Sequence, residues 1–185
     1  MTRAVFLDRD GVLNAICYEG GTAGSPRRPD EFHLLPGVAA AVQLLRASEF
    51  VVVVITNQPD LSRGRMRWAD LDAMHEALVG EVEIDRIEVC AHSGHEGCEC
   101  RKPRPGMIMR AADELGIDLA SSWTVGDRWV DIAAGSSAGT RTLLIAQSHS
   151  WSATSSGSPD RFLRPNGVVG DLSEAVAVIR ADQLA

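Results

Sequence analysis

The sequence predicts an α/β protein with a doubly wound, mostly parallel sheet, and two observations lead to this fold class. The apolar residues are mainly Val, Ala, Leu and Ile, and they gather in short continuous runs. Such runs are typical of strands that are buried on both faces of a parallel sheet. Segments with helical periodicity separate them, and this alternation of strands and helices indicates a doubly wound sheet.

Six apolar runs are the predicted strands of this sheet. Each is short, bounded by polar or turn residues, and too continuous to belong to a half-exposed strand. In chain order they are Ala4–Leu7, Phe50–Thr56, Arg86–Ala91, Ser122–Gly126, Arg141–Ile145 and Gly167–Val169.

Five helices are predicted between and after these strands. The first begins at about Pro36, because proline suits the first position of a helix. The third ends before Gly116, which is a suitable left-handed cap. The helices are Pro36–Ser48, Trp68–Val79, Gly106–Leu115, a short one that follows Asp131, and Ser173–Ala181.

Two long segments show neither the pattern of a strand nor that of a helix. Gly20–Pro29 follows the first strand, where long loops often line a site. The Ser-rich segment at about residues 147–159 is predicted to be a mobile surface loop before a final strand and helix. At 185 residues the chain is expected to form one domain, residues 1–185, with no room for a separate cap domain.

Charge and hydropathy argue against several classes of protein. The formal net charge of −7 disfavours binding of nucleic acid over the whole surface. No apolar run approaches the ~18–20 residues that span a bilayer, and charges interrupt the N-terminal run too early for a signal peptide. We therefore expect a cytoplasmic monomer that binds neither nucleic acid nor a membrane.

Carboxylates gather after two of the predicted strands. Asp8 and Asp10 follow the first strand, and Asp127 and Asp131 follow the fourth. In an open α/β sheet, ligands bind beyond the carboxyl ends of the strands. Carboxylates that converge there raise each other's pKa unless they share a cation. Oxygen ligands favour a hard ion such as Mg²⁺, which keeps waters that a phosphate can replace.

A phosphate site is predicted beside this ion. Thr56, Asn57 and Lys102 could hold the equatorial oxygens of a phosphoryl group, where charge accumulates during transfer. Asp8 and Asp10 would face the same side of a regular strand, so Asp8 could attack phosphorus while Asp10 transfers protons. Each motif alone is as well explained by a turn or a helix cap. Their joint placement at successive strand ends favours an enzyme.

A second candidate metal site lies in residues 90–100. Three thiols and one imidazole suit tetrahedral Zn²⁺, and four protein ligands would make the site structural. The C-x-C spacing is tighter than usual, so redox-active or merely buried thiols remain alternatives. His95 is a competing ligand within the loop. The four candidate ligands are Cys90, His92, Cys98 and Cys100.

These residues resemble the four motifs of the haloacid dehalogenase-like phosphatases. Further matches include Ser62-Arg63-Gly64 after the second motif and a Cys-Arg-Lys-Pro run before the third helix. In these the chain is similar to the heptose bisphosphate phosphatases and to the related histidinol-phosphate phosphatases, which carry such a zinc loop. The motifs are Asp8-Arg9-Asp10-Gly11-Val12-Leu13-Asn14, Thr56-Asn57-Gln58, Lys102-Pro103-Arg104-Pro105-Gly106, and Gly126-Asp127-Arg128 with Asp131.

The resemblance implies a role for each matched residue. Asp8 would be the nucleophile and Asp10 the general acid and base. Magnesium would be bound by Asp8, the backbone carbonyl of Asp10 and Asp127, with Asp131 in support. Phosphate would be held by Thr56, Asn57 and Lys102, and the rest of the substrate would touch Arg101 and Arg128.

The expected activity is Mg²⁺-dependent hydrolysis of a small phosphorylated metabolite, a heptose 1,7-bisphosphate cleaved at position 7. Two features depart from the heptose enzymes. Gln58-Pro59-Asp60 replaces their Gln-Ser-Gly, and the zinc loop is short, as in the histidinol-phosphate branch. Histidinol phosphate and other phosphomonoesters therefore remain alternative substrates. A zinc-stabilised interaction module with a vestigial site is the non-enzymatic alternative.

Overall fold

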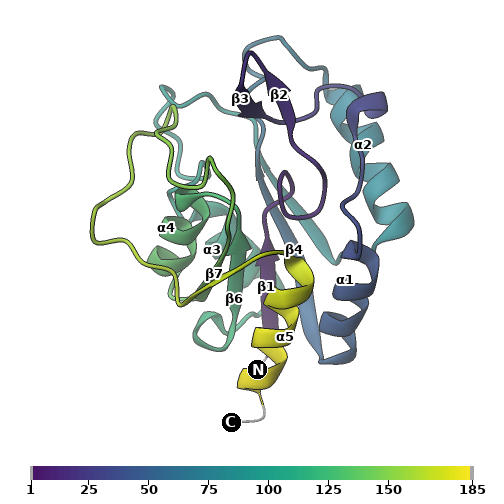
Figure 1. Cartoon of the computed structure of the whole chain (residues 1–185), viewed down its shortest axis with the longest axis vertical. Coiled ribbons are helices and arrows are strands. Elements are labelled where there is room, and N and C mark those ends of the chain that lie inside the picture. Colours follow the sequence, from purple (N-terminus) through teal and green to yellow (C-terminus); the bar gives the residue numbers. More distant parts are fainter. Residues whose placement is uncertain (1, 184–185) are drawn as a thin grey trace.

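Six parallel strands form one sheet in the computed structural model, which describes residues 2–183, with helices on both faces (Figure 1). The strand order is β5-β4-β1-β6-β7-β8, and every pairing is parallel. This confirms the predicted doubly wound α/β class and all six predicted strands. They are β1 (Arg3–Leu7), β4 (Phe50–Asn57), β5 (Arg86–Cys90), β6 (Trp123–Gly126), β7 (Arg141–Ile145) and β8 (Gly167–Val169).

Two apolar layers sandwich the sheet. Val5 and Leu7 of β1 belong to the cluster that includes α1 (Val38–Ala47), α2 (Trp68–Glu81) and α5 (Leu172–Asp182). Ala4 and Phe6 belong to the opposite cluster, with α3 (Gly106–Leu115) and α4 (Trp129–Ala138). Successive residues of a strand point to opposite faces, so a strand covered on both sides must be apolar throughout. This is why continuous runs marked the strands.

Two helix starts differ from the prediction. The first helix begins at Val38 and not at Pro36, because Gly37 is its N-cap, with a left-handed φ of 82° that an α-helix does not include. The helix predicted to follow Asp131 begins at Trp129 and contains that residue. The backbone N–H of Arg128 donates to Asp131 Oδ2 at 3.0 Å, so the carboxylate caps the first turn from within it.

Part of the predicted Gly20–Pro29 loop is a β-hairpin. Strands β2 (Cys17–Glu19) and β3 (Thr22–Gly24) are antiparallel. Gly20 and Gly21 turn the chain between them with φ values of 56° and 79°, which other residues rarely adopt. We call residues 17–27 the flap. It stands above the carboxyl ends of the strands, at the top of Figure 1. Two short 3₁₀ turns, Pro29–Glu31 and Leu119–Ser121, complete the elements.

The Ser-rich segment, residues 147–159, packs against α4. His149 and Ser150 are buried, so the prediction of a surface loop is wrong for these two residues. The backbone N–H of Trp129 donates to the Ser150 carbonyl at 2.9 Å, and its indole Nε1 donates to the Ser152 carbonyl at 3.0 Å. Two hydrogen bonds thus tie the segment to Trp129, the first residue of α4.

Length and hydropathy of the helices bear on the membrane prediction. Among residues 2–183, no helix combines the length and the apolar character needed to cross a bilayer. The longest, α2, has 14 residues.

Candidate active site

A cleft of about 1000 Å³ opens at the carboxyl ends of β1 and β4, beneath the flap. Asp8 and Asp10 lie on its floor, and Lys102 reaches it from the loop before α3. Its walls come from the flap, the loop after β4 and the Ser-rich segment. The sheet topology thus brings together side chains that are up to about 150 positions apart, as the rule for open α/β sheets predicts.

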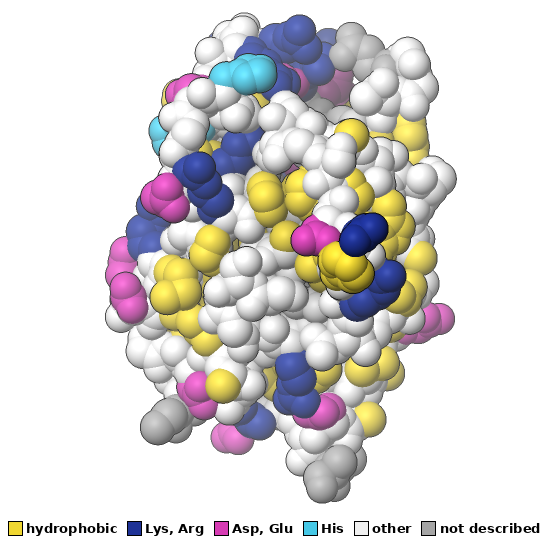
Figure 2. Space-filling model, turned by 90° about the vertical axis from the view of Figure 1, so that its left-hand side faces the viewer, with side chains coloured by type: hydrophobic (Ala, Val, Ile, Leu, Met, Phe, Trp, Pro, Cys, Tyr) yellow, Lys and Arg dark blue, Asp and Glu magenta, His cyan; other side chains and the backbone are white. Residues whose placement is uncertain are grey.

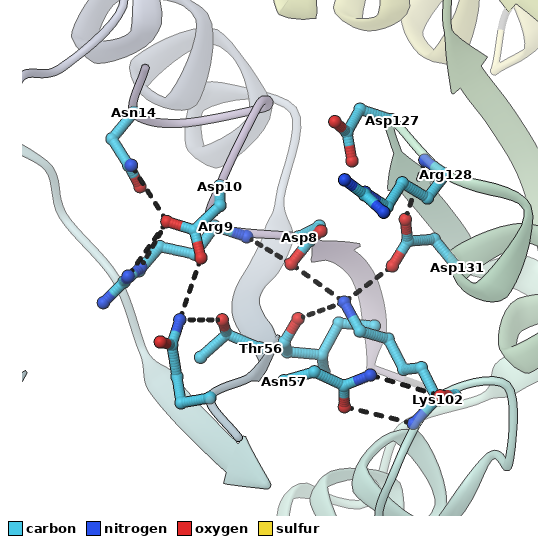
Figure 3. Close-up of polar contacts among 12 residues, drawn as sticks. Asp8, Arg9, Asp10, Asn14, Thr56, Asn57, Lys102, Asp127, Arg128 and Asp131 are labelled. Carbon is cyan, nitrogen blue, oxygen red and sulfur yellow. Dashed lines mark hydrogen bonds and ion pairs between the residues drawn. The ribbon is translucent and has the colours of Figure 1, made fainter. Parts of the chain in front are cut away.

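Lys102 links two of the carboxylates (Figure 3). Its Nζ lies 2.8 Å from Asp8 Oδ1 and 2.6 Å from Asp131 Oδ1. It also donates to the Ile55 carbonyl at 2.8 Å. Asp8 Oδ1 accepts a further bond from the backbone N–H of Arg9 at 2.7 Å. Asp8 Oδ2 is therefore the oxygen that is left without a protein donor, and it points toward Asp127 in the view.

The electrostatics of the cluster show that it is short of positive charge. Burial and the Asp131 carboxylate outweigh the opposing effect of Lys102 and raise the pKa of Asp8 to about 7. Burial also raises the pKa values of Asp127 and Asp131. Burial would lower the pKa of Lys102, but Asp131 and Asp8 together raise it above its usual range. One ammonium group serves three buried carboxylates, so a second cation would relieve their repulsion.

The donor set fits a hard divalent cation. Asp8, Asp127 and Asp131 each offer an oxygen, and these oxygens lie within 4.8 Å of one another. Asp127 Oδ1 is buried and has no hydrogen-bond partner. A buried carboxylate oxygen is rarely left without a partner unless it binds a cation. The structure brings the carboxylates of Asp8, Asp127 and Asp131 together, without that of Asp10, and oxygen-only ligands are those that Mg²⁺ prefers.

Two glycines make room for these carboxylates. A Cβ on Gly11 would lie 2.3 Å from Asp127 Oδ2, and one on Gly126 would lie 2.1 Å from Asp131 Cβ. Any other residue at either position would place its Cβ against one of these carboxylate side chains. The glycines of the Asp-x-Asp-Gly and Gly-Asp motifs are thus required by close approach, and Gly11 also has a left-handed φ of 87°.

Asp10 occupies a different environment from Asp8. It lies in the turn after β1 and not in a regular strand. Its Oδ1 accepts from Arg9 Nη2 and from Asn14 Nδ2, both at 2.9 Å, and its Oδ2 accepts from Gln58 Nε2 at 2.8 Å. Burial would raise the pKa of Asp10, but Arg9 and the hydrogen bonds lower it. The pKa values of these two neighbouring carboxylates are thus shifted in opposite directions, so without a cation Asp8 holds its proton more tightly than Asp10 does.

Two of the predicted phosphate ligands turn out to hold other residues. Asn57 exchanges hydrogen bonds with the main chain of Lys102: its Nδ2 donates to the Lys102 carbonyl at 3.1 Å, and the Lys102 N–H donates to its Oδ1 at 3.2 Å. Thr56 is fully buried, and its Oγ1 accepts from Gln58 Nε2 at 2.8 Å. In this structure the two side chains position Lys102 and Gln58.

The rim of the cleft is rich in arginine, and Lys and Arg side chains gather at the top of Figure 2. Arg101 donates to Ser155 Oγ at 2.9 Å and to Ser156 Oγ at 3.1 Å. Arg128 donates to the Ala23 carbonyl in the flap at 3.2 Å. Both arginines line the cleft, as predicted, and both also tie one wall to another. The rim arginines are Arg27, Arg63, Arg65, Arg101 and Arg128.

The four predicted zinc ligands form a cluster beside this rim. Cys98 Sγ lies 3.7 Å from Cys90 Sγ and 3.5 Å from Cys100 Sγ, and His92 Nδ1 lies 3.3 Å from Cys100 Sγ. A tetrahedral zinc site with Zn–S bonds of about 2.3 Å has ligand–ligand edges of about 3.8 Å. The cluster therefore has the size of a zinc site, and its imidazole comes from His92. His95 lies outside it and is exposed.

Five residues of the site were not assigned a role from the sequence. Asn14 and Gln58 belong to the first and second motifs, but their positions in the sequence do not indicate that both side chains bond to Asp10. Arg9 is fully buried, and its Nη1 lies 3.3 Å from His75 Nε2. Burial and Arg9 lower the pKa of His75 to about 4, so its neutral ring can accept that bond. His149 contacts Asp127, and no local pattern could have indicated this.

Several known proteins are similar to this chain in sequence and in fold. Residues 99–175 match the HAD-hydrolase-like family model. The D-glycero-beta-D-manno-heptose-1,7-bisphosphate 7-phosphatases of Escherichia coli O6:H1 and Bordetella bronchiseptica are 36% and 37% identical, over 76% and 77% of this chain and 78% and 80% of their own. A crystal structure of the B. bronchiseptica D,D-heptose 1,7-bisphosphate phosphatase with magnesium and phosphate aligns over the full length of both chains, with a TM-score of 0.78 and 33% identity.

Proposed function

The chain belongs to the haloacid dehalogenase-like phosphatases, and from this premise we propose that it removes the 7-phosphate of a heptose 1,7-bisphosphate through an aspartyl-phosphate on Asp8. The observation that carries the proposal is the set of three buried carboxylates around Lys102 at the strand ends. Bound Mg²⁺, held by Asp8 and Asp127 with Asp131 in support, would offset their charge and that of the phosphate.

In the first step a carboxylate oxygen of Asp8 attacks phosphorus, and the bond from phosphorus to the sugar oxygen breaks. Lys102 holds Asp8 in place and balances the charge on the transferred group. Asp10 gives a proton to the departing sugar oxygen. The lowered pKa of Asp10 at first sight opposes this role, but a phosphate dianion beside it raises that pKa, because like charges disfavour the ionised form.

In the second step water attacks the phosphorus of the aspartyl-phosphate. Asp10, now a carboxylate, accepts a proton from that water, and the bond between phosphorus and Asp8 breaks to release inorganic phosphate. The hydrogen bonds from Arg9, Asn14 and Gln58 keep the Asp10 carboxyl group in position through both steps. Here its lowered pKa favours the carboxylate that the step requires.

The charge of the rim favours a bisphosphate over histidinol phosphate. Five arginines line the cleft. Asp60 stands at the position where the heptose enzymes have glycine. Its carboxylate lies 2.5 Å from Arg27 and 3.5 Å from Arg63. It is therefore engaged with arginines and poorly placed to receive an ammonium group. A second phosphate is attracted by such a rim, whereas the amino group of histidinol phosphate is repelled.

The proposal is tested by measuring phosphate release from purified protein with Mg²⁺. Heptose 1,7-bisphosphate, heptose 7-phosphate and histidinol phosphate are compared at equal concentrations. We expect the highest kcat/KM for the bisphosphate and a kcat that is lower by about 10³-fold or more in Asp8→Asn. A preference for histidinol phosphate would overturn the substrate assignment. Folded wild-type protein that hydrolyses none of these, nor a generic phosphomonoester, would favour the non-enzymatic interaction module.

A further inference from the structure

His149 is a buried side chain for which the proposed mechanism has no step. It lies in the Ser-rich segment, and its Nε2 is 2.6 Å from Asp127 Oδ2. Only 9% of His149 and 1% of Asp127 are exposed. The two residues are 22 positions apart, so the contact depends on how the segment folds over α4.

Ser150, the residue after His149, anchors the backbone of the segment to α4. Ser150 Oγ accepts from the Gln147 backbone N–H at 2.9 Å, and the Ser150 carbonyl accepts from the Trp129 N–H at 2.9 Å. The backbone of His149 thus lies in a turn that Gln147 and Ser150 close and that Trp129 anchors, and the ring bonds to Asp127 through Nε2, while its buried Nδ1 has no hydrogen-bond partner. Groups fixed by their own hydrogen bonds hold a partner more accurately than mobile ones do.

The two oxygens of Asp127 have different surroundings. Oδ2 is enclosed by the His149 ring and by Gly11, whose missing Cβ leaves the space for it. Oδ1 is buried and accepts no hydrogen bond from the protein. With Oδ2 engaged, Oδ1 is the oxygen that remains for a cation shared with Asp8 and Asp131.

We propose that His149 is a positioning residue that donates its Nε2–H to Asp127 Oδ2 and thereby presents Oδ1 to Mg²⁺. The inference rests on the proposed role of Asp127 as a magnesium ligand. The proton belongs on Nε2, because a carboxylate accepts hydrogen bonds and cannot donate them. Partners of this kind orient a ligand, and their removal typically weakens metal binding about 10–100-fold.

The test measures binding of Mg²⁺ alone, without substrate, by titration calorimetry. Loosely held Mg²⁺ is removed by gel filtration and not by a chelator, which would also strip zinc. His149→Ala and His149→Leu remove the donor, and the leucine keeps most of the buried volume. His149→Gln keeps an N–H donor. Ser148→Ala is the matched control, because Ser148 is the exposed neighbour.

We expect the Mg²⁺ dissociation constant to rise about 10–100-fold in His149→Ala and His149→Leu. It should stay near the wild-type value in His149→Gln and Ser148→Ala. The kcat at saturating Mg²⁺ should fall much less than the affinity, a split that a general packing defect would not produce. Wild-type affinity in folded His149→Leu would overturn the role of His149 while leaving the proposed function intact. Wild-type protein that binds no Mg²⁺ would instead overturn both.

A measurement on wild-type protein covers the case in which both donor-free variants fail to fold. Nitrogen NMR of the His149 ring distinguishes its two neutral tautomers. We expect the proton on Nε2 both with and without Mg²⁺. A proton on Nδ1 alone would contradict the proposal, since Nε2 would then have nothing to donate.

Discussion

The molecule has two clusters of side chains that could hold a metal ion, and they are built in opposite ways. Asp8 and Asp127 follow the neighbouring strands β1 and β6, Asp131 lies in the first turn of α4, and the sheet brings the three together. The residues of the zinc loop, Cys90 to Cys100, span eleven positions. The carboxylates have Lys102 among them, whereas the thiols and His92 contact mainly one another.

This difference indicates what each metal would do. The sheet holds the carboxylates in place without an ion, and three ligand groups leave Mg²⁺ positions for water and phosphate. The zinc loop has four candidate ligands, and apart from Cys90 its residues are half-buried or exposed, so a metal would hold the loop, and binding would be coupled to local folding. Loss of Mg²⁺ should therefore stop catalysis and spare the fold. Loss of zinc should disturb the loop first and catalysis second.

The largest effect is expected for Asp8→Asn. An amide cannot form the phosphorylated intermediate, so kcat should fall about 10³-fold or more. The substitution also removes one of three mutually repelling carboxylates. The thermal midpoint without metal should therefore stay the same or rise. Phosphate release and calorimetry check both expectations, and substantial turnover by this variant would show that another residue is the nucleophile.

The next largest effect is expected for Cys100→Ser. This variant should lose zinc, and its thermal midpoint should fall. Activity should drop by up to about 10²-fold, because Arg101 and Lys102 follow directly in the chain and small displacements of catalytic groups are costly. Elemental analysis, calorimetry and phosphate release measure the three quantities. Cys17→Ser is the control, since Cys17 lies in the flap and outside the cluster. Equal zinc content in both variants would contradict the assignment.

The two clusters taken together show how far the sequence predicts the molecule. The strands were predicted because burial on both faces leaves an uninterrupted apolar run, and the residues of the two candidate metal clusters because they fall in short motifs. The flap hairpin was missed, since its strands are three residues each and partly exposed. The start of α4 was placed too late, because the Asp131 carboxylate caps a turn that already contains it.

The supporting contacts were beyond sequence reasoning for a different reason. His149 reaches Asp127 only through the path of the Ser-rich segment, which has no periodicity. The side chains of Asn57 and Thr56 were expected to hold phosphate, and the sequence did not indicate that they also bond to Lys102 and Gln58. A motif indicates which residues share a site. It does not indicate which of them bond to one another.

A pH dependence is expected at the carboxylate cluster. The pKa of Asp8 is about 7 in the folded protein and 3.8 ordinarily. Between these values the folded protein keeps a proton that the unfolded chain has released. Its metal-free stability therefore falls as the pH rises from about 4 to 7. Mg²⁺ competes with that proton, so it should stabilise the protein more at pH 8 than at pH 5.

Thermal unfolding with and without Mg²⁺ measures this dependence. At about 100 times Kd, binding contributes about 2.7 kcal/mol, which for a chain of this size shifts the thermal midpoint by about 5–10 °C. We expect that shift at pH 8 and little or none at pH 5. In Asp127→Asn it should be small at both pH values. An equal shift at pH 5 and pH 8 in the wild type would contradict the raised pKa of Asp8.

The smallest effect is expected at the rim. Asp60→Asn removes the carboxylate that holds Arg27 and Arg63, and partly exposed ion pairs contribute about 1 kcal/mol or less. We expect a change of KM for the bisphosphate of at most about fivefold, with kcat retained. Asp30→Asn is the matched control, because Asp30 pairs with Arg28 in an exposed position. A large fall in kcat would show that Asp60 takes part in the chemistry.

A crystal structure with Mg²⁺ and beryllofluoride, which mimics a phosphoryl group on a carboxylate, tests the central claim most directly. We predict beryllium bonded to an oxygen of Asp8, Mg²⁺ in contact with Asp8 and Asp127, and Lys102 beside the fluorides. Beryllofluoride on another side chain, or Mg²⁺ bound away from these aspartates, would contradict the account.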